Sequence, residues 1–220
     1  MTSPSFDWIA HHASVRGDKL AVHDLDSDRK FTYSQMNERT SRLAAALREA
    51  FSIKRGDRVA VLAENDSNFF EVQFACWKLG AVFVPLNWRL SIPELEYIVG
   101  DADPDVIIHD DAFVDNATKL AELCQIDHRI SWGSDTQGSA TYEEVLTSHE
   151  PLSGSEKCTH DDTLTIMYTS GTTGRPKGAI ITQGMTFWNA VNCVEYYGCA
   201  ESMINLAFLP LFHTGGLNVF

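Results

Sequence analysis

The sequence lacks the features that mark several broad classes of protein. No apolar stretch approaches the length of a membrane-spanning helix, and the first residues show no basic region followed by an apolar run. Neither a membrane span nor a secretory leader is therefore expected. The five cysteines form no C-x-x-C pair, so no metal site and no disulfide framework are predicted. Together these absences favour a cytoplasmic protein with reduced thiols.

Positive charge is also scarce in this chain. Its 17 lysines and arginines face 30 aspartates and glutamates, which gives a formal net charge of -13 at pH 7. This balance argues against nucleic acid as a partner. From Thr163 to Val194, however, the only charged residues are Arg175 and Lys177, so this segment is locally cationic.

The order of the predicted elements indicates the fold class. Apolar residues make up 44% of the 220-residue chain, enough for a sizeable core. Buried strands are predicted at residues 59–63, 81–86 and 105–109, with helices between them at 69–79 and 92–102. Such alternation is typical of an α/β protein with a doubly wound, mostly parallel sheet flanked by helices. Another buried strand is predicted at residues 164–168.

Capping signals support the helices of this interpretation. Thr32 and Gln35 have capping-box spacing, as do Ser91 and Glu94, and Thr141 is expected to cap a further helix. A later helix should begin after Thr182 and run to about residue 197. The adjacent pair His11 and His12 is interpreted as two surface residues, because neighbours on a helix point to different faces.

The segment from Tyr168 to Gly178 combines glycines, hydroxyl side chains and one lysine directly after the strand at 164–168. Backbone N–H groups of a glycine-rich bend, short hydroxyl donors and a mobile ammonium group form a cradle for an anion. The three glycines of this segment are expected to allow positive φ angles. The segment is not a Walker A motif, because Pro176 replaces the second glycine and Lys177 is followed by no Ser or Thr. A short strand at 179–182 should follow.

This segment resembles the phosphate-binding signature of the adenylate-forming superfamily, which includes acyl-CoA synthetases, aryl-CoA ligases, luciferases and the adenylation domains of peptide synthetases. Segments 54–61, 78–87 and 209–216 resemble acyl-CoA synthetases in the expected order, so the resemblance covers nearly the whole chain. It implies that the β- and γ-phosphates of ATP contact Thr169, Ser170, Gly171, Thr172, Thr173, Gly174 and Lys177.

The resemblance also implies a domain organisation. Residues 1–51 would pack with a second α/β subdomain, residues 52–182 would form most of the first, and residues 183–220 would begin the second. Members of the superfamily are more than twice as long as this chain. The segments that hold adenine, ribose and Mg²⁺, and the C-terminal domain with its catalytic lysine, would lie beyond Phe220.

A second site is implied for the acid. By resemblance, His213 lies beside the reacting carboxylate as a catalytic residue, and Phe212, Gly215 and Gly216 line the same pocket. No carboxylate follows Phe212 to pair with a substrate ammonium, which favours a simple carboxylic acid over an amino acid. The run from Asn87 to Leu90 favours a fatty acid.

The implied function is activation of a carboxylic acid by ATP, with Mg²⁺, as an acyl-adenylate, followed by thioester formation with coenzyme A. Two alternatives remain open: an amino-acid or aryl-acid adenylation domain, and a non-catalytic, truncated nucleotide-binding module. The assembly is also open, with a homodimer as one candidate.

Overall fold

The central sheet of the computed structural model confirms the predicted doubly wound, mostly parallel architecture. The structure describes residues 3–134, 137–169, 175–198 and 202–217. Seven strands follow the order β7-β6-β5-β3-β4-β8-β9. All neighbours are parallel except β8 and β9, which form an antiparallel hairpin. The strands are β3 (Arg58–Leu62), β4 (Val82–Pro85), β5 (Val106–His109), β6 (His128–Ser131), β7 (Ala140–Thr141), β8 (Thr163–Thr169) and β9 (Lys177–Thr182).

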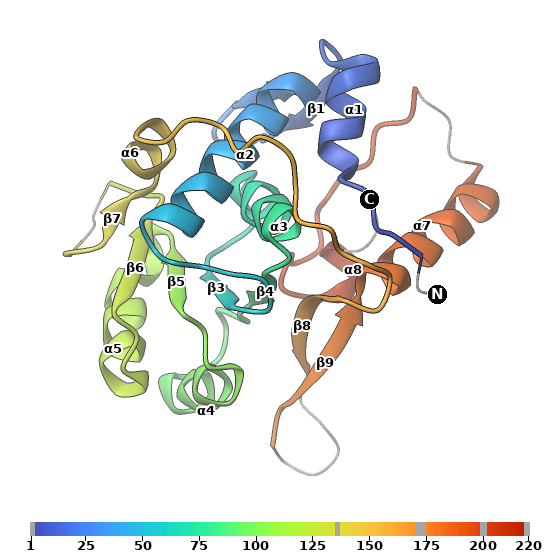
Figure 1. Ribbon diagram of the computed structural model, residues 1–220. Helices are drawn as coiled ribbons and strands as arrows, with labels where there is room; N and C mark the ends of the chain where they lie inside the picture. Colours follow the sequence, from blue (N-terminus) through green and yellow to red (C-terminus); the bar gives the residue numbers. More distant parts are fainter. Residues whose placement is uncertain (1–2, 135–136, 170–174, 199–201, 218–220) are drawn as a thin grey trace.

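Helices cover both faces of this sheet (Figure 1). One face packs against α2 (Tyr33–Glu49), α3 (Asn68–Leu79) and α6 (Tyr142–Thr147). The other face packs against α4 (Ile92–Ala102) and α5 (Val114–Cys124), which follows the short 3₁₀ helix η1 (Asp111–Phe113). Every residue of β4 and β5 is buried, as expected for strands covered on both sides.

Most of the local signals in the sequence are confirmed. Both capping boxes form, at Thr32 and at Ser91. Gly80 ends α3 in the left-handed conformation, with φ of 66°, where a side chain would be strained. Thr141 occupies the N-cap position of α6, as expected, but its side chain makes no capping hydrogen bond; the residue also ends the edge strand β7.

The N-terminal region adds α1 (Trp8–Arg16) and a small antiparallel pair, β1 (Leu20–His23) and β2 (Lys30–Thr32). The interpretation of His12 as a surface residue is wrong. Its ring is half-buried between the rings of Trp8 and Tyr33, with centroids 6.4 and 5.1 Å away. His11 is exposed, as expected.

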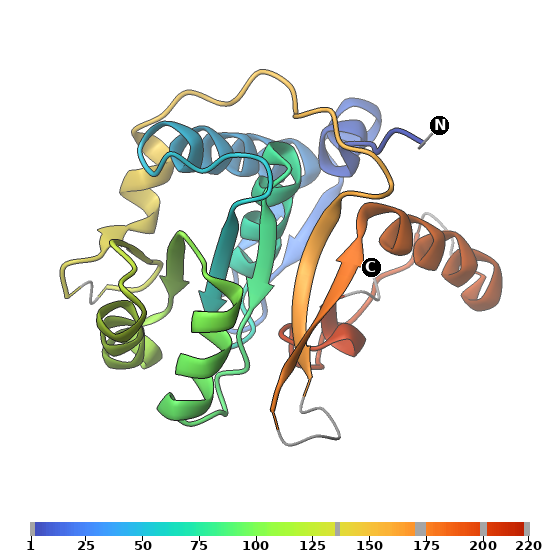
Figure 2. The same cartoon turned by 60° about the horizontal axis from the view of Figure 1, so that its bottom comes forward.

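The last described elements are α7 (Gln183–Tyr197) and the short α8 (Thr214–Leu217). Thr182 accepts a hydrogen bond from the N–H of Met185 and caps α7, which lies beside β9 at the edge of the sheet opposite β7 (Figure 2). The proposed division at residues 51 and 182 stays a prediction. Contacts cross both boundaries: α2 packs on α3, and the Trp8 ring stacks on Phe187 of α7 at 6.0 Å. No helix among the described residues combines the length and apolar character that a membrane span requires.

Candidate functional site at the carboxyl edge of the sheet

The polarity of the strands determines where side chains from distant segments meet. β3, β4, β5, β6 and β8 are parallel, so their carboxyl ends share one edge of the sheet. From β3 the chain continues through α3 on one face, whereas from β5 it continues through α5 on the other face. Between two adjacent strands whose connections diverge in this way, a doubly wound sheet leaves a crevice where ligands bind.

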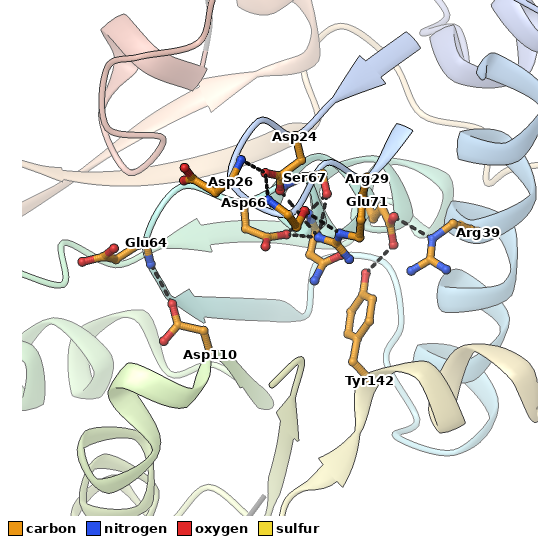
Figure 3. Close-up of polar contacts among 12 residues, drawn as sticks. Asp24, Asp26, Arg29, Arg39, Glu64, Asp66, Ser67, Glu71, Asp110 and Tyr142 are labelled. Carbon is orange, nitrogen blue, oxygen red and sulfur yellow. Dashed lines mark hydrogen bonds and ion pairs between the residues drawn. The ribbon is translucent and has the colours of Figure 1, made fainter. Parts of the chain in front are cut away.

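The segment after β3, residues 63–68, lies at this divergence and is fixed from the β5 side. The N–H of Glu64 donates a hydrogen bond to the carboxylate of Asp110, which directly follows β5, at 2.9 Å (Figure 3). Burial raises the pKa of Asp110 above its ordinary value, although backbone N–H donors oppose this shift. The contact joins the ends of β3 and β5.

The same segment is fixed on its other side by Arg29. The guanidinium group donates to Asp66 at 2.6 Å and to the hydroxyl of Ser67 at 2.7 Å (Figure 3). It also donates to Asn68 at 3.1 Å. Asp24 accepts a hydrogen bond from the N–H of Ser67 at 3.2 Å. Residues 64–68 are therefore held by side chains from two sides of the fold.

A buried carboxylate anchors α3, which follows this segment. The side chain of Glu71 is fully buried and accepts hydrogen bonds from Arg39 at 2.7 Å and from the hydroxyl of Tyr142 at 3.0 Å (Figure 3). Burial raises the pKa of Glu71, while the Arg39 guanidinium opposes that rise. This cluster ties α3 to α2 and α6, so its role is structural.

The predicted phosphate cradle falls on the hairpin of β8 and β9. Thr169 and Lys177 pair across the hairpin, and Lys177 is exposed. Ser170, Gly171, Thr172, Thr173 and Gly174 lie outside the described residues, and their role stays a prediction. The expectation of a positive φ at Gly178 is wrong. A Cβ there would lie 2.8 Å from Ile166 Cγ2 and 3.2 Å from Tyr168 Cζ, so glycine leaves room for neighbouring side chains of β8.

The end of this hairpin nearest its turn is attached to α4. The hydroxyl of Tyr168 donates to the carboxylate of Asp101 at 2.6 Å, and the guanidinium of Arg175 lies 5.7 Å from the centroid of the Tyr97 ring. Burial and the neighbouring Asp101 raise the pKa of Tyr168, so the phenol stays protonated as a donor. Two contacts thus position the strands on either side of the predicted cradle.

The predicted acid site falls on the 209–217 loop, which includes the single helical turn of α8 at its end. Leu211 and Leu217 are buried in the core of the sheet and anchor this loop, whereas Phe212 is half-buried and His213 is exposed. Nδ1 of His213 accepts a hydrogen bond from the N–H of Gly215 at 3.1 Å. In the neutral ring, the proton is therefore on Nε2, which remains a donor.

The two glycines of this loop differ in their surroundings. A Cβ on Gly216 would lie 2.2 Å from the carbonyl oxygen of Pro210 and 2.7 Å from that of Leu209, so the glycine allows the loop to close on itself. A Cβ on Gly215 would meet no atom closer than 3.4 Å. Of the two, only Gly215 has space beside it that a substrate could share, and the pocket role of both stays a prediction.

Three residues outside the predicted acid site contact this loop, two of them from the run at residues 87–90. Asn65 forms two hydrogen bonds with its backbone, to Leu209 and to Leu211. After β4, the Arg89 guanidinium lies 4.8 Å from the ring centroid of Trp88 and 5.6 Å from that of Phe212. For Asn65 the available signal was its position after the carboxyl end of a predicted strand, whereas Trp88 and Arg89 belong to the run that the resemblance had already connected with the acid.

The described residues provide cationic and hydroxyl groups for phosphates but no evident metal ligands. In the parts of the chain that the structure covers, no group of three or more His, Cys, Asp or Glu side chains could hold a metal ion. Lys177 and Thr169 suit a triphosphate, and the ligands of Mg²⁺ stay predicted beyond Phe220.

Known proteins are similar to this sequence over most of its length. The sequence is 35% identical over 213 residues to indoleacetate–CoA ligase from Aromatoleum aromaticum, covering 96% of this chain and 41% of that protein. It is 38% identical over 188 residues to a feruloyl-CoA synthase from an Amycolatopsis species, covering 86% and 35%.

Solved structures of known enzymes share the fold of this chain. ATP-bound MatB from Rhodopseudomonas palustris superposes with a TM-score of 0.84 at 27% identity, over 98% of this chain and 42% of that one. o-Succinylbenzoate CoA synthetase (MenE) from Bacillus subtilis, in complex with its acyl-adenylate intermediate, gives a TM-score of 0.83 at 29% identity, over 99% and 41%.

The chain spans about two-fifths of the length of these relatives. The model of the family described as AMP-binding enzyme matches residues 9–220, nearly the whole sequence. This chain therefore belongs to the AMP-binding enzyme family.

Proposed function

We propose that this chain supplies the phosphate-binding hairpin and part of the acid site of an AMP-forming acid–thiol ligase. In the first step a carboxylate oxygen attacks the α-phosphorus of ATP, and pyrophosphate leaves. In the second step the thiol of coenzyme A attacks the acyl carbon of the adenylate, a thioester forms, and AMP leaves. Mg²⁺ would neutralise charge on the phosphates when it is bound.

A single contact carries this proposal. The hydroxyl of Thr214 lies 3.1 Å from the sulfur of Met167, which is two residues before Thr169 in β8. This contact brings the loop with His213 against the strand that leads into the phosphate cradle. Both reactants of the first step would then meet at one edge of the sheet, as in-line attack requires.

We assign roles to the described side chains on this basis. Lys177 and the hydroxyl of Thr169 hold the β- and γ-phosphates while pyrophosphate departs, mainly through charge and hydrogen bonding. His213 lies beside the carboxylate, where its Nε2–H can donate to the reacting oxygen. Replacing His213 with alanine should lower kcat/KM for the acid and leave binding of ATP unchanged; wild-type kinetics for every acid would contradict this role.

The substrate is proposed to be a simple carboxylic acid. The stretch from Phe212 to Gly216 contains no carboxylate, and the charged side chain recorded against Phe212 is the cation Arg89. A substrate ammonium would find no partner there and would be repelled. The preference for a fatty acid stays a prediction, since indoleacetate–CoA ligase and feruloyl-CoA synthase are named for aromatic acids.

Acid-dependent exchange of labelled pyrophosphate into ATP tests the proposal in the full-length enzyme. The panel should contain indoleacetate, ferulate, 2-succinylbenzoate, a long-chain fatty acid and phenylalanine as the amino acid. Exchange with at least one of the first four acids supports the function. Exchange with phenylalanine alone would favour an amino-acid adenylation domain, and ATP binding without exchange for any acid would favour a non-catalytic nucleotide-binding module.

A further inference from the structure

One exposed asparagine connects the sheet to the loop of residues 209–217. Asn65 follows β3 by three residues, and its side chain reaches a segment 144 to 146 positions later in the sequence. Nδ2 donates to the carbonyl oxygen of Leu209 at 2.9 Å, and Oδ1 accepts from the N–H of Leu211 at 2.9 Å. Both ends of the carboxamide are therefore used by one short stretch of backbone.

The chemistry of this contact is specific to an amide. Leu209 and Leu211 flank Pro210, which has no N–H to donate. The carboxamide of Asn65 thus pairs with the acceptor before the proline and with the donor after it. Only one orientation of the amide satisfies both bonds, and no other side chain of the same size offers a neutral donor and acceptor together.

The position of Asn65 is itself well determined. The residue before it is bonded to Asp110 at the end of β5, and the residue after it is bonded to Arg29. The residues on both sides of Asn65 are thus held by contacts that involve no part of the 209–217 loop, through the backbone of Glu64 and the side chain of Asp66. Asn65 can therefore hold the loop at a fixed distance from the ends of β3 and β5.

The other end of the contact leads directly to the predicted acid site. Leu211, whose N–H bonds to Asn65, is the residue before Phe212 and two before His213. Its side chain is buried in the core, so the Asn65 bond and the leucine side chain fix the backbone at this point. Arg89 and Trp88 contact Phe212 from the segment after β4. The loop is thus positioned by the ends of two neighbouring strands.

We propose that Asn65 is a positioning residue for the acid site: it holds the backbone of Leu209–Leu211 so that Phe212 and His213 face the acid in the productive geometry. This inference rests on the proposed function. Asn65 acts through the loop and is not itself required to touch the substrate.

The variants Asn65→Asp and Asn65→Ala in the full-length enzyme test the inference. Aspartate keeps the size of the side chain and the acceptor for Leu211, but it loses the donor and turns a carboxylate toward the carbonyl of Leu209. Alanine removes both bonds. The matched control is Asn116→Asp on α5, which makes the same chemical change outside this contact.

The first readout is the pyrophosphate exchange kinetics. In both Asn65 variants we expect KM for the acid to rise roughly tenfold, the size of effect that the net contribution of one hydrogen bond to the loop backbone would give. KM for ATP and the unfolding midpoint should stay close to those of the control. An unchanged KM for the acid, or an equal rise for acid and ATP, would overturn the positioning role.

The second readout needs no activity. Hydrogen exchange of the peptide that contains the Leu211 amide should be roughly tenfold faster in Asn65→Ala than in the wild type or in Asn116→Asp. An unchanged exchange rate would overturn the inference, because the contact would then not hold the loop. If the wild-type enzyme activates no acid, the proposed function has failed, and hydrogen exchange still decides whether Asn65 restrains this loop.

Discussion

Charged side chains in this chain have two different kinds of role, which their exposure separates. Lys177 is exposed at the start of β9, and no ion pair to it is recorded among the described residues. Glu71 is fully buried and satisfied by Arg39 and Tyr142. Removing the Lys177 side chain should lower activity with little cost in stability. Disturbing the contacts of Glu71 should instead lower the stability of the fold.

Replacing Lys177 with alanine should lower kcat/KM for ATP by roughly ten- to a hundredfold, because a charge-assisted contact to the triphosphate is lost. The free energy of unfolding should change by less than about 0.5 kcal/mol, as expected for an exposed side chain. Pyrophosphate exchange and chemical denaturation measure the two quantities. Lys157→Ala, which removes another exposed lysine, is the control, and an effect of equal size there would contradict the assignment.

Replacing Arg39 with alanine should destabilise the protein by about 3–5 kcal/mol, because Glu71 loses its charged partner inside the fold. Denaturant titration measures this cost. Adding Glu71→Gln to the same variant should restore part of the stability, since the neutral amide needs no cation. Equal stability of the single and the double variant would show that the buried charge is not the cause.

At the scale of elements, packing around single residues decides how neighbouring segments meet. The β8–β9 hairpin depends on a glycine opposite a tyrosine, because the bare backbone of Gly178 leaves space for the Tyr168 ring on the paired strand. The Tyr168 hydroxyl then reaches Asp101 on α4. The orientation of the hairpin relative to α4 follows from this combination of steric fit and hydrogen bond.

A Gly178→Val substitution should displace the Tyr168 ring and destabilise the protein by about 1–3 kcal/mol, as overpacking does elsewhere. Tyr168→Phe, which removes only the hydroxyl, should cost about 0.5–1.5 kcal/mol. Thermal and chemical denaturation of both variants give these values. A valine variant as stable as the wild type would show that the Tyr168 ring can adopt another position at no cost in stability.

The packing of α1 makes a prediction about pH. Burial, together with the charge of Arg16, lowers the pKa of His12 below its ordinary value of 6.5, and Nδ1 of this ring is buried with no hydrogen-bond partner recorded among the described residues. The unfolded chain therefore binds the proton more readily than the folded one. The contribution of His12 to stability is complete above pH 6.5 and is lost as the pH falls through the lower folded pKa.

His12→Phe should remove this contribution to the pH dependence. Denaturation midpoints at pH 7.5 and pH 5.5 should differ less in the variant than in the wild type. The same substitution at the exposed neighbour His11, whose charge makes the smallest of the three contributions to the lowered pKa of His12, should leave most of the wild-type dependence in place. A pH profile that is identical for His12→Phe and the wild type would contradict the assignment.

At the scale of the whole molecule, apolar surface is concentrated at one end of the chain. On α7 the side chains of Trp188 and Val194 are 57% and 54% exposed, and farther along Ile204 and Phe208 are 93% and 73% exposed. Where exposed apolar side chains gather in a patch, they favour association. The chain also matches only about two-fifths of the length of its relatives.

The 220-residue chain made by itself should therefore associate as its concentration rises. The paired substitution Trp188→Lys and Ile204→Lys should reduce this association, because it places charge on the apolar surface. Leu123→Lys, at an exposed leucine on α5, should not. Sedimentation velocity over a range of concentrations measures the effect, and a monomer at every concentration would refute it.

The sequence by itself determined much of the local structure. Hydrophobic periodicity, capping boxes and helix-ending glycines act over a few residues, so the alternating strands and helices and the caps at Thr32, Ser91 and Thr182 were predictable. The residues of the phosphate segment were likewise sufficient to indicate the family. The role of each residue in that segment stays a prediction.

Only the tertiary structure decided which distant residues meet. Three features depend on segments that are far apart in the chain: the burial of Glu71 and Lys78 in a helix with a mostly apolar sequence, the order of the strands, and the contact between Asn65 and the 209–217 loop. Lys78 is tolerated because Asp7 and Asn37 reach its ammonium group. Such pairings follow no periodic pattern in the sequence, because the partners interact only after the packed elements bring them within a few ångströms of each other.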